Sequence, residues 1–158
     1  MIVFPDTSFL CSLYRQQDHS PKAIARMARR IGPITVSGLL LLEFRQSLRL
    51  QVRLHANDRT KGFGRAEADA MLRDFESDLK SGVFVVAPVD WPDVHRLAET
   101  LSDRHTESNG HRLVDLLHVA TALHLGAAEF LSFDANQRKL AEARSEEHTS
   151  ELQSRQYL

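Results

Sequence analysis

The chain has 158 residues, of which 42% are hydrophobic and 26% are charged, as expected for one folded domain. Its 20 lysine and arginine residues nearly balance 21 aspartate and glutamate residues, so net charge alone does not indicate a nucleic-acid partner. No apolar run approaches the ~20 residues of a membrane span, and the first residues lack the basic region of a signal peptide. A single cysteine, Cys11, excludes an internal disulfide and a cysteine-based zinc cluster. We therefore expect a cytoplasmic protein.

Short apolar runs alternate with helical patterns in the first half of the chain. The apolar start is closed by Pro5, and Ser20 with Pro21 gives a helix-start signal. The predicted elements are, in order, a strand at 2–4, a helix at 7–14, a helix at 20–31, a strand at 33–36, a helix at 37–55 and, after a polar loop, a helix at 65–81.

The same alternation continues in the second half. Gly82 and Gly126 each follow a helical pattern, and Trp91 with Pro92 begins another. The predicted elements are a strand at 83–86, a helix at 91–104, a loop at 106–110, a helix at 112–125, a strand at 129–133 and a helix at 134–143. Strands that alternate with helices predict an α/β fold with a parallel sheet and right-handed crossovers.

The last residues, 144–158, differ from the rest of the chain. They resemble the translation of a sequencing-library adapter, so we interpret them as a non-native, irregular tail that follows a domain at 1–143. The alternative is a natural polar tail.

Four acidic residues fall where strand patterns end or helical patterns begin. Asp6 and Asp134 directly follow predicted strands. Glu43 lies in the second turn of one predicted helix, and Asp115 lies in the first turn of another. Because ligands bind at the carboxyl edge of a parallel sheet, all four are candidates for one site. Gathered carboxylates repel one another, whereas Mg²⁺ or Mn²⁺ would make the same cluster a site for phosphodiester chemistry.

Each acid also has a structural interpretation. Asp6 is a suitable N-cap, and Asp134 with Gln137 has the spacing of a capping box. Glu43 and Asp115 interrupt apolar stretches, and their alternative is an exposed helix face. The joint arrangement, rather than any single acid, therefore favours a site.

Motifs around these acids resemble those of a PIN domain, and more specifically those of the VapC-type toxin ribonucleases of bacterial toxin–antitoxin pairs. The resemblance covers residues 1–143. It rests on the Asp-Thr-Ser start at 6–8, on Glu43 at the long helix, on the segment 111–127 around Asp115, and on the Phe-Leu-Ser-Phe-Asp segment that ends at Asp134.

The resemblance implies a metal-dependent endoribonuclease toxin that is neutralised by a cognate antitoxin and forms a homodimer. It implies a PIN-like three-layer α/β/α fold with a central parallel sheet of four strands. Family members usually continue into a fifth edge strand, which we expect to be missing because the adapter-like tail begins where that strand should approach. The site residues implied are the metal-binding acids Asp6, Glu43, Asp115 and Asp134, with Thr7 or Ser8 as the hydroxyl beside the first acid.

Two other functions stay open: a non-catalytic PIN-like module that binds RNA or protein, and a DNA nuclease or small phosphohydrolase on the same fold. The chain has no His-Glu-x-x-His motif, which disfavours a zinc hydrolase. His118 lies three residues after Asp115 on the same helical face, and we interpret it as a packed histidine rather than a ligand.

Arginines are the expected contacts to a phosphate backbone. Arg112 is the preferred candidate because it begins the helix that carries Asp115, at the predicted carboxyl edge. The other candidates for RNA binding lie on the second predicted helix: Arg26, Arg29 and Arg30.

Overall fold

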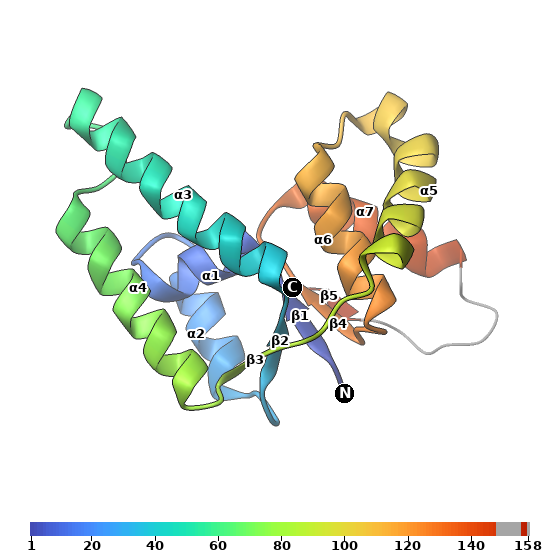
Figure 1. Ribbon diagram of the computed structural model, residues 1–158, viewed down its shortest axis with the longest axis horizontal. Coiled ribbons are helices and arrows are strands. Elements are labelled where there is room, and N and C mark those ends of the chain that lie inside the picture. Colours follow the sequence, from blue (N-terminus) through green and yellow to red (C-terminus); the bar gives the residue numbers. More distant parts are fainter. Residues whose placement is uncertain (148–155, 158) are drawn as a thin grey trace.

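The computed structural model describes residues 1–147 and 156–157, with side chains described for residues 1–143 (Figure 1). Helices and short strands follow one another in the predicted order. The elements are β1 (Val3–Pro5), α1 (Thr7–Tyr14), α2 (Ser20–Ala28), β2 (Ile34–Val36), α3 (Gly38–Asn57), α4 (Arg65–Lys80), β3 (Phe84–Val86), α5 (Trp91–Asn109), α6 (Leu113–His124), β4 (Glu129–Leu131), α7 (Ala135–Glu147) and β5 (Gln156–Tyr157).

Helix boundaries follow local capping chemistry. Asp6 caps α1 by accepting the backbone N–H of Phe9 at 2.9 Å, as a preferred N-cap residue does. The predicted loop at 106–110 is wrong, because α5 continues through Asn109 and ends at Gly110. Gly110 has a φ of 66°, a left-handed conformation that favours glycine, and no earlier residue in this segment forces the helix to stop.

All strand pairs are parallel: β1 pairs with β4, β4 with β5, and β2 with β3. β1 and β2 are neighbours, but no ladder joins them, so the predicted central sheet is hydrogen-bonded in two parts. Pro5 explains the interruption. The N–H of Asp6 donates to Leu131 of β4 at 2.9 Å, so the N–H of residue 5 would point towards β2, and proline has none.

The expectation that the fifth edge strand is missing is wrong. β5 pairs with β4 in the register Glu129 with Gln156 and Phe130 with Tyr157. α7 also extends four residues beyond the predicted end at residue 143, to Glu147, so the segment 144–158 is not irregular throughout. The residues at 144–147 are Arg-Ser-Glu-Glu, which are compatible with a helix, and backbone pairing in a strand requires no particular side chains, so the composition of this segment did not exclude either element. Residues 148–155 and 158 lie outside the described residues.

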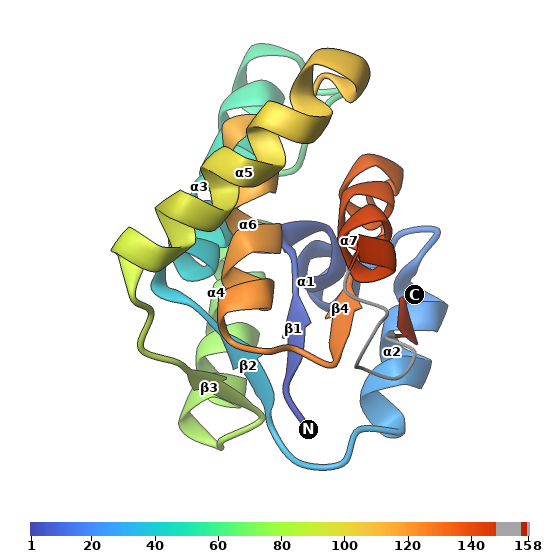
Figure 2. The same ribbon diagram turned by 90° about the vertical axis from the view of Figure 1, so that its right-hand side faces the viewer.

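Two groups of helices flank the strands and form the predicted three-layer arrangement. α1 to α4 lie on one side of the strands and α5 to α7 on the other (Figure 1). The view turned by 90° shows β1 between β2 and β4, with β3 beyond β2 (Figure 2). Within the described residues, no helix has both the length and the apolar composition needed to cross a membrane.

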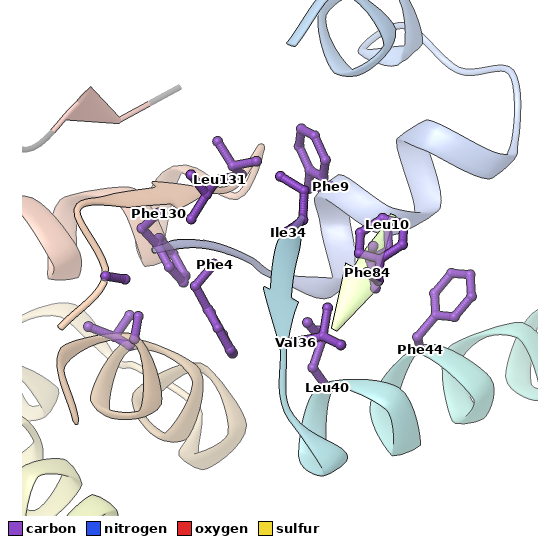
Figure 3. Close-up of a cluster of buried hydrophobic side chains, with 14 of the residues drawn as sticks. Phe4, Phe9, Leu10, Ile34, Val36, Leu40, Phe44, Phe84, Phe130 and Leu131 are labelled. Carbon is purple, nitrogen blue, oxygen red and sulfur yellow. The ribbon is translucent and has the colours of Figure 1, made fainter. Parts of the chain in front are cut away.

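The hydrophobic core lies on both sides of the strands, against α1 to α4 and against α5 to α7, and Figure 3 shows a part of it. Phe4 and Phe130 stack across the β1–β4 pair with ring centroids 6.5 Å apart. Val36 and Phe84 contribute from β2 and β3, and Phe44 contributes from α3. All of these side chains are buried, and together they fix the strand ends from which the acidic residues project.

Candidate metal centre

Asp6 follows β1 and is fully buried. Its Oδ1 accepts hydrogen bonds from the Ser8 hydroxyl at 2.6 Å and from the Phe9 N–H at 2.9 Å. Its Oδ2 accepts from the Ser132 hydroxyl at 2.5 Å, just beyond the end of β4. Burial raises the pKa of Asp6, and these donors together with the nearby His118 offset only part of that rise. A cation beside Asp6 would therefore stabilise the charged carboxylate.

Glu43 connects three elements. Its Oε2 accepts the hydroxyl of Thr7 on α1 and lies 2.5 Å from Nε2 of His118 on α6. Desolvation opposes ionisation of Glu43, but the hydrogen bonds from His118 and Thr7 outweigh it and lower the pKa. The contact with His118 joins α3 of the first helix group to α6 of the second.

Asp115 lies in the first turn of α6 and is 3% exposed. Arg112 donates to both carboxylate oxygens, from Nε at 2.9 Å and from Nη2 at 3.0 Å. Gln137 of α7 donates to Oδ1 from Nε2, also at 3.0 Å. The Arg112 side chain is 69% exposed, so its guanidinium pairs with a buried acid from the solvent side. An arginine fork of this kind occupies the carboxylate as a bound cation would.

Asp134 precedes α7 and acts as its N-cap. Its Oδ1 accepts the backbone N–H of Asn136 at 2.8 Å and that of Gln137 at 3.2 Å. The side chain of Gln137 turns to Asp115 instead of returning to the N–H of Asp134, so the reciprocal half of the predicted capping box is absent. Asp134 therefore has a structural role whether or not it also binds metal.

The four acids lie in one electrostatic neighbourhood. The hydrogen bond and charge of Asp115 raise the pKa of Arg112, and the charges of Asp134 and Glu43 add to that rise. His118 bonds Glu43 and also lowers the pKa of Asp6 through its charge. Within the described part of the chain, no three carboxylate, histidine or cysteine side chains already stand in position to hold a metal ion. Binding a metal would require Arg112 and other present partners to release carboxylate oxygens.

The predicted basic residues divide between two places. Arg112 lies with the acids, as expected. Arg26, Arg29 and Arg30 instead line a cavity of about 460 Å³ beside the first residues of the strands, including Glu129. The structure therefore places these three arginines at the amino edge, opposite the acids. The strand–helix alternation could have indicated this, because a helix that leads into a parallel strand ends at the amino edge of the sheet.

Sequence reasoning missed the hydrogen-bonding partners of the acids. Ser132 bonds Asp6, Gln137 bonds Asp115, and His118 is fully buried against Glu43. His118 is thus packed, as interpreted, but it also contacts the acidic cluster. The only sequence signal for it was its spacing from Asp115 on one helical face.

Parallel strands, helices on both sides and an acidic carboxyl edge define the class: an α/β domain whose site suits a hard divalent cation. The chain matches the PIN domain family over residues 3–143 and belongs to that family. PIN domains are generally nucleases that depend on divalent metal ions. No curated protein sequence matches the chain.

Several solved structures share the fold. VapC20 from Mycobacterium tuberculosis, a sarcin-ricin loop cleaving toxin, aligns with a TM-score of 0.62 and 22% identity over 87% of this chain and 93% of that chain. FitAcB from Neisseria gonorrhoeae aligns with a TM-score of 0.63 and 14% identity over 89% and 94%. PAE2754 from Pyrobaculum aerophilum aligns with a TM-score of 0.56 and 18% identity over 96% and 97%. At these identities the likeness is one of fold.

Proposed function

We propose that this protein is a metal-dependent endoribonuclease of the toxin type, with Mg²⁺ or Mn²⁺ held by carboxylates at the carboxyl edge. The observation that carries the proposal is the excess of acid at one place. Asp6, Glu43, Asp115 and Asp134 lie in one neighbourhood, in which Arg112 interacts with three of them and the buried His118 with two. Membership of the PIN family supports a nuclease, and the likeness to VapC20 favours RNA as the substrate.

The donor set fits a hard cation. The available ligand atoms are carboxylate oxygens, and the described residues of the cluster include no thiolate. Burial disfavours the charged form of Asp6, so a cation there would lower the free energy of the folded protein. When bound, a divalent ion would activate water and stabilise charge on the phosphodiester.

The protein's own groups orient this site. Thr7 and His118 hold one oxygen of Glu43, and Ser8 and Ser132 hold the two oxygens of Asp6. These donors fix the direction of each carboxylate, as outer-shell partners of metal ligands do. Arg112 is exposed at the mouth of the site and is the group that we assign to the RNA phosphate.

The test is cleavage of single-stranded RNA by the purified chain. We expect cutting in Mg²⁺ or Mn²⁺ and none in excess EDTA, with activity restored when the metal is returned. A single-stranded DNA of the same sequence separates the RNA assignment from the DNA nuclease alternative. Full activity in EDTA would refute the metal site.

A non-catalytic module that binds RNA or protein is the second candidate. Asp134 supports this candidate, because its carboxylate caps α7 and so stabilises the fold without a metal. RNA binding without cleavage at any metal concentration would select this candidate.

We further propose a cognate antitoxin, a homodimer and a cytoplasmic location. Exposed leucines on α3, Leu42 and Leu50, are 61% and 50% accessible and give apolar surface on which a protein partner can pack. Light scattering of the purified chain tests the dimer. A monomer at all concentrations would reject it without bearing on the nuclease.

A further inference from the structure

A second cavity lies beside the acidic cluster. It has a volume of about 230 Å³ and lies between the end of α5, the turn before α6 and one side of α7. Its lining includes two histidines, two asparagines, a lysine and an apolar floor: His105, His111, Asn109, Asn136, Lys139 and Leu140. We call it the histidine cavity.

Both histidines of this cavity carry a nitrogen without a partner. Nε2 of His105 and Nδ1 of His111 are buried and make no hydrogen bond within the described residues. A buried polar atom without a partner destabilises a fold, so two of them in one cavity need an explanation. An imidazole can turn about its Cβ–Cγ bond, which would bring its nitrogens to a ligand in the cavity.

Residues of the histidine cavity are next to residues of the acidic site in the sequence. His111 directly precedes Arg112, and Asn136 gives its backbone N–H to Asp134 at 2.8 Å. The charges of Asp115 and Asp134 also reach His111 and tend to raise its pKa, although burial, with a smaller contribution from His105, gives a net lowering. A polymer bound across the acids would therefore place a neighbouring unit at this cavity.

The lining selects the kind of ligand. A metal ion is disfavoured because the cavity carries the cation Lys139 and no carboxylate or thiolate among its lining residues. The imidazole rings offer faces on which a flat ring can stack, whereas amide and imidazole nitrogens can read its edge. Lys139 can pair with an adjoining phosphate.

We propose that the histidine cavity binds one nucleobase of the RNA strand, next to the phosphodiester on which the acidic cluster acts. This inference rests on the proposed function, because it takes RNA as the ligand. It makes the cavity a source of sequence preference, since the amide and imidazole groups can distinguish base edges while Arg112 contacts only the backbone.

The test measures binding of 2′-O-methyl hexanucleotides of A, C, G or U to the full chain by fluorescence anisotropy. EDTA is present so that metal-dependent cleavage does not intervene. We expect one base to bind best, and His105→Leu, His111→Leu and Lys139→Gln each to weaken that binding about tenfold. The leucine variants should keep or raise their melting temperature, because each removes a buried nitrogen that has no hydrogen-bond partner.

Matched controls lie elsewhere on the surface. His95→Leu changes an exposed histidine of α5 that contacts Trp91, and Lys80→Gln removes the same charge from the end of α4. Both should bind the hexanucleotides as the parent chain does. Equal binding of all four bases, or unchanged affinity in Lys139→Gln, would overturn the inference, and this exposed substitution avoids any question of misfolding.

The possible outcomes distinguish the proposed base site from the proposed nuclease function. RNA cleavage with no effect of the three variants on hexanucleotide binding would keep the proposed function and reject the base site. Base-selective binding that the variants weaken, without cleavage in any metal, would keep the base site and reject the nuclease.

Discussion

The two edges of the strands both contain buried carboxylates, but only one edge balances their charge. At the amino edge, Glu129 is paired by both Nε and Nη2 of Arg26, and the two side chains are 9% and 12% exposed. At the carboxyl edge, four acids share Arg112 and His118. Glu129 therefore has an arginine to itself, whereas Arg112 at the carboxyl edge interacts with three acids at once.

A buried carboxylate is therefore a poor sign of function by itself. The ion pair of Arg26 and Glu129 neutralises both charges, and both of its side chains are nearly buried, whereas the Arg112 side chain that pairs with Asp115 is 69% exposed. The acids of the carboxyl edge are held by neutral hydroxyl and amide donors as well, which orient them without neutralising them. A candidate site is therefore distinguished from a structural ion pair by carboxylates whose side chains are oriented but not neutralised.

Asp115→Asn should give the largest effect. The amide keeps the size of the side chain but removes the charge that a metal needs, so RNA cleavage per folded molecule should fall by about 10³–10⁴-fold. The melting temperature should fall only slightly, because Arg112 is 69% exposed and stays hydrated when the pair is lost. Single-turnover cleavage and thermal melts measure the two quantities. Normal cleavage, or loss of activity only through unfolding, would show that Asp115 is not a ligand.

Glu129→Gln tests the balanced edge. It leaves Arg26 charged and poorly compensated, so the free energy of unfolding should fall by about 3–5 kcal/mol. Cleavage per folded molecule should be unchanged, because the pair lies opposite the acids. The double substitution Arg26→Met with Glu129→Leu should recover most of the stability. A specific loss of RNA binding in the double variant would restore Arg26 as a nucleic-acid contact.

Arg112→Gln should separate the two roles of this side chain. Removing the fork frees both oxygens of Asp115, so Mn²⁺ affinity measured by calorimetry should rise several-fold. RNA affinity should fall by a similar factor, because a phosphate contact is lost. Arg29→Gln at the amino edge is the control for total charge. If Mn²⁺ binds equally to both variants and to the parent chain, Arg112 does not compete for the site.

Asp6→Asn should stabilise the metal-free protein at neutral pH by about 1 kcal/mol, because burial disfavours the carboxylate and not the amide. Mg²⁺ should raise the melting temperature of the parent chain and have less effect on this variant. Asp90→Asn changes an exposed acid that makes no side-chain cap and should behave like the parent chain. A clear destabilisation would mean that hydrogen bonding to Asp6 outweighs its burial.

Deleting residues 148–158 should have the smallest effect, at most about 1 kcal/mol, because the deletion removes a two-residue ladder from β4. Chemical denaturation of both chains measures it. A much larger loss would contradict our interpretation of 144–158 as a non-native tail.

Local chemistry made much of the fold predictable. Apolar runs, capping residues and glycines located the helices and strands within a few residues, and strand–helix alternation gave the parallel α/β architecture. The end of α5 and the presence of β5 were missed. A polar segment without a breaker can continue a helix, and an edge strand can be completed by backbone groups alone.

The sequence by itself determined which acids follow strands and begin helices, because strand ends and N-caps are local properties. Only the tertiary structure decided how those acids are held. Ser132 reaches Asp6 across 126 positions and His118 reaches Glu43 across 75, distances along the chain that no periodicity encodes. The pair of Arg26 and Glu129 at the opposite edge likewise joins segments that are 103 positions apart in the sequence. Pairings between distant segments are set by packing of the whole core, so charge balance at each edge became visible only in the folded chain.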